Sequence, residues 1–291
     1  MKKILALLLA LWIPAAVLSG CAPQDASAAS NKLNIVTTIF PAYDWVREIL
    51  GDETDRAEIT TLLDSGVDLH SYQPTVDDIV KISECDLFLY VGGESDGWVE
   101  DALKNAPNKD RKVIRLLDVL GDSAKAEETV EGMQEEEQDH EEEEHGHEEE
   151  AEYDEHIWTS PVNAMKFTEV IADTLSKCDP ANETRYEEGK EAYLKELEAL
   201  HEGFLEVSKN RRRNMIVVGD KFPFRYLAEE YGFDYRAAFS GCSTDTEPSA
   251  KTIAYLIDKV RTEEIPVVYY LELSSHRVSE IIGEETGAKT E

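Results

Sequence analysis

The chain has 291 residues and carries 62 acidic side chains against 29 basic ones, a formal net charge of −33 at pH 7. Nucleic-acid backbones attract the opposite charge, so this composition argues against nucleic-acid binding. Besides Cys21 the sequence holds Cys85, Cys178 and Cys242 without any CxxC spacing, so a cysteine metal cluster is not expected.

The N-terminus predicts export and lipidation. Two lysines precede an apolar stretch, residues 4–17, which is too short for a membrane-spanning helix but has the length of a secretory signal core. The stretch ends in Leu-Ser-Gly-Cys at 18–21, which resembles the bacterial lipobox, where cleavage precedes a cysteine that is then acylated. We expect a signal peptide at 1–20, lipidation at Cys21, a tether at 21–31 and a location on the outer face of a bacterial cell membrane. A cleavage site with an incidental cysteine is the alternative.

Apolar runs alternate with amphipathic runs in the first part of the mature chain. Strand-like runs occupy residues 33–39, 57–63, 86–91 and 113–117, and helix-like runs occupy 41–50, 75–85 and 97–105. Thr75, with Asp78 three residues later, forms an approximate capping box. Strands separated by helices predict βαβ units, in which a parallel sheet is covered on both faces.

Residues 127–152 form an almost continuous acidic run that contains His140, His145 and His147. A segment this charged repels itself and cannot bury a core, so we expect a mobile insert. Imidazoles among carboxylates suggest weak capture of several divalent cations. A solvated acidic linker without a metal function is the alternative.

A long helix is predicted beyond the helix that begins at Ser160-Pro161. The segment 182–212 has no proline, and side chains recur at spacings of three and four residues, at Tyr186, Lys190, Tyr193, Leu197, Leu200, Phe204 and Val207. This stripe predicts one helix with a single buried seam that spans two lobes, although a coiled-coil strand has the same pattern.

A second set of βα units follows the long helix. Strand-like runs lie at 214–219, 234–240 and 266–271, and helix-like runs lie at 223–232, 248–263 and 274–286. Gly287 is a plausible helix C-cap. The sequence thus predicts an α/β fold of two lobes with parallel sheets joined by one helix.

Three histidines outside the acidic run lie in loops at strand or helix ends. His70 follows a predicted strand, His156 directly precedes a predicted helix, and His276 follows the last predicted strand. Open α/β sheets bind ligands at such transitions. Each histidine alone would more often be a surface or capping residue, but three in equivalent positions favour a metal site. His201 lies on the polar side of the long helix, where a solvated role is expected.

The sequence resembles the solute-binding lipoproteins of metal-uptake ABC transporters, the zinc and manganese class. The resemblance rests on Gly51-Asp52, the G-x-D-x-H-x-Y-x-P run ending at Pro74, the D-x-H-x-W-x-S-P run at 154–161, the Tyr-x-x-x-x-Tyr-Gly run at 226–232, and Glu247-Pro248-Ser249. It implies two α/β lobes, one rigid helix between them and a metal cleft between the lobes. His-rich acidic inserts ahead of the second histidine motif are a habit of the zinc-binding members.

Position by position, His70 and His156 match the two metal ligands of the family's N-terminal lobe. The third family ligand, a His or Glu, falls at the end of the first strand of the second lobe. There Lys221 occupies the position that aligns with the family's ligand, and Asp220 is the nearest residue that can bind a metal. The fourth falls at His276. Three imidazoles and one carboxylate favour Zn²⁺ over Mn²⁺, which prefers more oxygen.

The resemblance also implies the domain organisation and the function. It places the N-terminal lobe at 32–178, the linker helix at 179–213 and the C-terminal lobe at 214–291, without the family's last strand and helix. In relatives with a similar Gly-Cys-Ser motif, the cysteine that matches Cys242 pairs with one in that tail, so Cys242 is expected to be unpaired here. The expected function is the capture of Zn²⁺ by a lipid-anchored monomer and its delivery to an ABC permease. The alternatives are a manganese-binding member of the class and a metal-binding surface adhesin.

An enzyme is not expected. Residues 93–97 fit the G-x-S-x-G pattern of serine hydrolases, but Glu94 and Asp96 would place two negative charges beside a developing oxyanion. The HExxH pattern of zinc hydrolases is absent from the sequence.

Overall fold

The computed structural model describes residues 32–63, 67–104, 107–134, 152–245 and 247–291. The segment Leu33–Glu291 forms one compact unit, and all elements below belong to it. The predicted signal peptide, Cys21 and the three histidines of the acidic run lie outside the described residues. Within the described residues, no helix combines the length and apolar character needed to cross a membrane.

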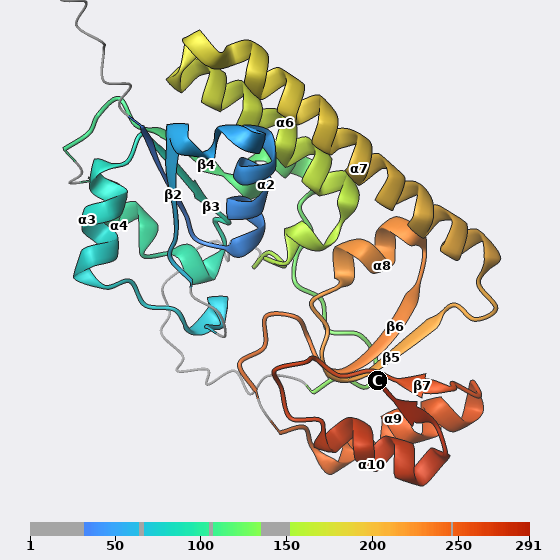
Figure 1. The fold of residues 1–291 in the computed structure, drawn as a ribbon. Helices are drawn as coiled ribbons and strands as arrows, with labels where there is room; N and C mark the ends of the chain where they lie inside the picture. Colours follow the sequence, from blue (N-terminus) through green and yellow to red (C-terminus); the bar gives the residue numbers. More distant parts are fainter. Residues whose placement is uncertain (1–31, 64–66, 105–106, 135–151, 246) are drawn as a thin grey trace, which may run out of the picture. The chain divides into compact units, whose positions relative to one another are not determined.

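The first sheet consists of four parallel strands in the order β2-β1-β3-β4 (Figure 1). Its strands are β1 (Leu33–Thr37), β2 (Ala57–Thr61), β3 (Leu87–Tyr90) and β4 (Lys112–Arg115). Ile35 of β1 pairs with Ile59 on one side and with Leu87 on the other. The predicted parallel sheet is confirmed, and each predicted strand lies within three residues of its observed ends.

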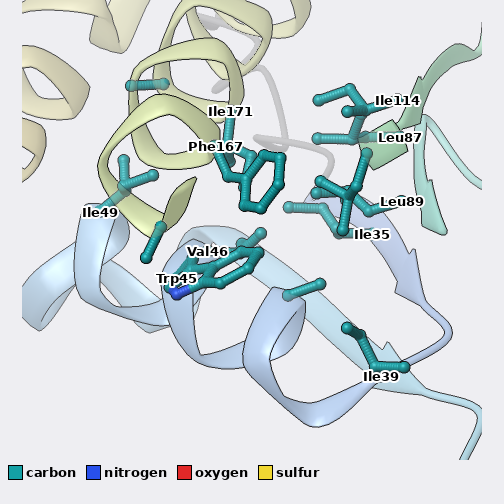
Figure 2. Packing of buried hydrophobic residues seen from close by; sticks show 14 of the residues in the cluster. Ile35, Ile39, Trp45, Val46, Ile49, Leu87, Leu89, Ile114, Phe167 and Ile171 are labelled. Atoms are coloured by element: carbon teal, nitrogen blue, oxygen red, sulfur yellow. The ribbon is translucent and has the colours of Figure 1, made fainter. Parts of the chain in front are cut away.

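Helices cover both faces of this sheet because successive strand residues point to opposite sides. Ile35 and Leu87 pack with α2 (Phe40–Leu50) and α6 (Pro161–Cys178), whereas Val36 and Phe88 pack with α3 (Val76–Glu84) and α4 (Val99–Lys104). Figure 2 shows the first of these layers, in which the rings of Trp45 and Phe167 lie 5.2 Å apart between helix and sheet. Burial of each large side chain contributes roughly 1.5–3 kcal/mol.

Local capping fixes where two of these helices begin. Thr75 Oγ1 accepts a hydrogen bond from the Asp78 N–H, and the Asp78 carboxylate accepts one from the Thr75 N–H, so the predicted capping box is confirmed. Ser160 Oγ caps α6 by accepting from the Asn163 N–H. The prediction was wrong at residues 116–117, which begin α5 (Leu116–Leu120) instead of ending a strand. Both of these leucines are buried, and an apolar pair has no periodicity that distinguishes strand from helix.

The predicted long helix is α7 (Glu183–Asn210), 28 residues in one continuous element. Its first half packs on α2 and α6, where Gly189 lies so close to α2 that an added Cβ would overlap the carbonyl oxygen of Ile49. The predicted single buried seam is wrong in the second half, since Leu200 and Val207 are 49% and 57% exposed. There α7 contacts the short helix α8, where Phe204 stacks on Tyr231 with the ring centroids 5.0 Å apart.

The second half of the fold contains two parallel strand pairs. They are β5 (Met215–Lys221) with β6 (Asp234–Phe239) and β7 (Val267–Val268) with β8 (Lys289–Thr290), and a bridge between Val218 and Tyr269 connects β5 to the end of β7. The helices are α8 (Arg225–Tyr231), α9 (Ala250–Thr262) and α10 (Arg277–Thr286), and Gly287 is the predicted left-handed C-cap of α10. Strand β8 was not predicted because a strand of two residues is too short to show the alternation of apolar and polar side chains.

The acidic run begins inside the fold, which corrects the expectation of a mobile insert for residues 127–134. Met133 is 6% exposed and packs with Val218 of β5, and the Gln134 N–H donates to the carbonyl of Ala238. The two ends of the run also pair, with the Glu127 N–H donating to Glu152 O at 2.8 Å. The burial of Met133 explains why residues 127–134 belong to the fold. The acidic composition of the run did not indicate that one apolar side chain within it would be buried.

The remaining short helical segments are 3₁₀ helices. They are η1 (Gly51–Arg56), η2 (Leu69–Ser71), η3 (Glu94–Asp96), η4 (Gly121–Ser123), η5 (Ile157–Thr159) and η6 (Pro180–Asn182). Three of them, η2, η3 and η5, carry or flank the polar residues of the candidate site.

Candidate metal site

His70 lies in the loop that follows the carboxyl end of β2. Asp68 caps η2 through its side chain, whose Oδ1 accepts from the His70 N–H at 3.0 Å, and Leu69 is buried beneath the turn. The cap and the buried leucine together fix the direction of the imidazole. Only 9% of its side chain is exposed, so water screens little of its interaction with a neighbouring charge.

His156 is positioned by the turn that leads into α6. Asp154 Oδ1 accepts from the His156 N–H at 2.9 Å and lies 3.0 Å from Nδ1 of the same imidazole. Ile157 is fully buried and anchors the turn, and the hydroxyl of Tyr226 donates to the Asp154 carbonyl at 3.1 Å. A residue of α8 thus braces the loop that carries this histidine.

The two imidazoles face each other through their Nε2 atoms, which lie 3.4 Å apart. Two nitrogen ligands at 2.0–2.1 Å from one tetrahedral zinc ion are separated by about 3.3 Å. The pair therefore has the nitrogen-to-nitrogen spacing that a shared divalent ion requires.

The other ring nitrogens point at buried carboxylates. Asp154 Oδ1 lies 3.0 Å from His156 Nδ1, and Glu155 Oε2 lies 3.3 Å from His70 Nδ1. Both acids are 2% exposed. Burial pushes the pKa of Glu155 upward, but hydrogen bonds from His70 and Ser95 outweigh it and hold that pKa below the usual value. A carboxylate on Nδ1 directs the proton there and leaves Nε2 as the free donor atom for a metal.

The G-x-S-x-G segment supports His70 and does not form a catalytic relay. Ser95 Oγ lies 2.9 Å from His70 Nδ1, the nitrogen that also faces Glu155, whereas a triad places the serine and the acid on opposite ring nitrogens. The Ser95 N–H donates to Glu155 Oε1 at 2.8 Å and so is not free to hold an oxyanion. In the same turn Asp96 is 4% exposed, and burial raises its pKa to about 6.

In the structure the predicted ligands Asp220 and His276 make contacts away from the histidine pair. Among the described residues, no group of three potential ligands includes either of them. Asp220 Oδ2 accepts from the Ser274 hydroxyl and the Leu271 N–H, so the loop that follows β7 holds its carboxylate. The imidazole of His276 stacks on Tyr270 with the ring centroids 3.8 Å apart. Lys221, the residue in register with the family's third ligand, reaches Asp68 with a separation of 3.7 Å.

Comparison with known proteins identifies the family. Residues 35–291 match the family ZnuA, described as zinc-uptake complex component A, periplasmic. The chain belongs to this family. It is 34% identical, over its whole length, to the zinc-binding lipoprotein AdcA of Streptococcus pneumoniae, of which it covers 54%. It is also 32% identical, over 92% of its length, to the high-affinity zinc uptake system protein ZnuA of Bacillus subtilis, of which it covers 79%.

Solved structures agree with the family assignment. The Zn(II)-bound ZnuA-like domain of Streptococcus pneumoniae AdcA superimposes with a TM-score of 0.67 at 30% identity, covering 89% of this chain and 86% of that one. The chain spans about half the length of the AdcA relatives. The family resemblance and the α/β fold expected from the sequence are confirmed.

Two residues beside the histidine pair escaped the sequence analysis. Cys242 Sγ lies 3.9 Å from His156 Nδ1, and one ligand atom from each of His70, His156 and Cys242 lies within 4.8 Å of the others. Cys242 comes three residues after the end of β6, the same kind of strand-end loop that singled out His70, but a single cysteine without CxxC spacing carries no metal-site pattern. Glu155 stands next to His156 in a strongly acidic stretch, where no pattern marks one buried carboxylate.

Proposed function

We propose that the chain is the extracytoplasmic solute-binding component of an ABC uptake system and that Zn²⁺ is its cargo. The observation that carries the proposal is the His70–His156 pair, with the Nε2 atoms 3.4 Å apart and a buried carboxylate behind each ring. The zinc-binding names of the relatives support the same cargo. In this proposal Cys21 is lipidated, and the protein acts as a monomer on the outer face of the membrane.

The charges around the pair suit a divalent cation. Asp154 and Glu155 are both buried, and as carboxylates they balance the two positive charges of the ion while remaining behind the ligating rings. Imidazole nitrogens suit zinc better than manganese, which prefers a shell of oxygen atoms. Copper binds nitrogen donors at least as tightly, so the biological cargo also depends on which metal is supplied.

Growth at limiting zinc tests the proposal in the native organism. A strain that lacks the protein should stop growing in chelator-treated medium and recover when zinc is added. Wild-type protein should restore growth, and the double variant His70→Ala/His156→Ala should not. Full rescue by the double variant would overturn the assignment of the site. Recovery with manganese but not zinc would overturn the cargo, and normal zinc-limited growth of the deleted strain would point to adhesion instead.

A further inference from the structure

Cys242 stands where a third ligand from the C-terminal part of the chain would be needed. Its loop follows β6 (Asp234–Phe239), and the buried Gly241 packs against the edge of the His156 ring. A Cβ added at Gly241 would come within 3.1 Å of His156 Nδ1, so a larger residue would push the loop away. The glycine allows the following cysteine to approach the imidazole.

Cys242 is hydrogen-bonded to Glu127, at the start of the acidic run whose end leads to His156. The Cys242 N–H donates to Glu127 Oε1 at 3.1 Å, and the Glu127 N–H donates to Glu152 O, four residues before His156. His70, Glu155 and Cys242 line one pocket. The thiol and the His70 imidazole thus line the same pocket, and His156 lies within ligand distance of both although the three residues come from separate loops.

The distances fit a mixed nitrogen and sulfur shell. With zinc bonds of 2.0–2.1 Å to nitrogen and 2.3 Å to sulfur, a tetrahedral site separates nitrogen from sulfur by about 3.5 Å. One ring nitrogen of each histidine and Cys242 Sγ lie within 4.8 Å of one another. Because Sγ lies 3.9 Å from His156 Nδ1, the thiol has to move toward the Nε2 side of that ring to complete the shell.

Other residues of the C-terminal part do not serve as well. The carboxylate of Asp220 is held by Ser274 and Leu271, His276 stacks on Tyr270, and Lys221 is a cation that repels a metal. We propose that Cys242 supplies the third protein ligand of the cargo ion, beside His70 and His156. The inference rests on the proposed function, since it adds one ligand to that site. A thiolate favours Zn²⁺ or Cu(I) and disfavours Mn²⁺, so Cys242 would act as a selectivity residue.

Cobalt substitution tests the ligand directly. The full-length protein carrying Cys21→Ser should bind Co²⁺ under anaerobic conditions with visible d–d bands and an additional thiolate-to-cobalt charge-transfer band in the near ultraviolet. Cys242→Ser should lose the charge-transfer band, while the matched control Cys178→Ser should keep it. Loss of an outer-shell partner typically weakens metal binding by about 10–100-fold, so loss of this ligand should weaken zinc binding by more than about 100-fold.

A second measurement needs no variant. Zinc should protect Cys242 of the otherwise unchanged protein from alkylation by iodoacetamide, as read by peptide mass spectrometry, and Cys178 should react equally with and without zinc. Tight cobalt binding without a charge-transfer band, or equal alkylation of Cys242 in both states, would overturn the inference and leave the proposed function intact. Absence of any tight zinc or cobalt binding would instead overturn the proposed function itself.

Discussion

Replacement of Glu155 by glutamine tests whether the buried carboxylate behind His70 contributes to metal binding. The substitution keeps the size of the side chain and an oxygen that can accept from the Ser95 N–H, but it removes the negative charge 3.3 Å from His70 Nδ1. Glu155 is buried and its pKa is held low, so the charge is present at neutral pH in the wild type. Loss of an outer-shell carboxylate weakens metal affinity by about 10–100-fold, which equals roughly 1.4–2.7 kcal/mol.

The assay is competitive zinc titration against a chromophoric chelator, with circular dichroism to verify that the variant folds. The matched control is Glu94→Gln, which removes the same charge from the same pocket, but Glu94 is exposed and, within the described part of the chain, forms no ion pair with either histidine. We expect Glu94→Gln to change zinc affinity by less than about threefold because exposed charges are screened. Equal losses in the two variants would refute the reasoning, since long-range charge and not the orientation of His70 would then explain the effect.

Three further predictions concern the rest of the molecule. Gly189→Ala should lower the free energy of unfolding measured in urea, because overpacking against the Ile49 carbonyl costs about 1–3 kcal/mol and outweighs the better helix propensity of alanine. Gly203→Ala, on the open side of the same helix, should raise this free energy by about 1 kcal/mol. A gain in stability at both positions would contradict the close packing of Gly189. Asp96, with a pKa of about 6 in the fold, binds its proton more tightly than in the unfolded chain, so stability should fall by roughly 2–3 kcal/mol between pH 4 and pH 7 relative to Asp96→Asn, and identical pH profiles would refute this. Removal of residues 135–151 should abolish weak zinc equivalents in a titration but keep the tight site. Ordering a charged segment around one ion costs too much conformational entropy for tight binding. Loss of the tight site instead would show that the acidic run, and not the histidine pair, binds zinc tightly.

The elements predicted best are those whose signal is local. The capping box at Thr75 and the alternation of apolar runs around β1 and β3 depend on neighbours in sequence, and they appear in the structure within a few residues of the predicted ends. The failures of helix and strand prediction depend on distant partners. Leu200 has the right spacing for a buried seam but is 49% exposed, and Met133 is buried by strands about a hundred residues away.

The same distinction holds for the site. His70 and His156 could be singled out because each lies at an element end, and the structure brings their Nε2 atoms together. His276 satisfied the same rule, but its ring found an aromatic partner in its own loop. Cys242 approaches the pair only because Gly241 lets the loop pack against His156, a contact between residues 85 positions apart that no local pattern contains.

Calorimetric titration of zinc into the wild type and the double variant His70→Ala/His156→Ala tests the central claim most directly. The wild type should show one tight equivalent, with any weak equivalents following it. The double variant should retain its fold and the weak equivalents but lose the tight one. Both imidazole ligands are removed, and the carboxylates of Asp154 and Glu155 then have no ligand to orient. One tight equivalent of unchanged affinity in the double variant would contradict the account.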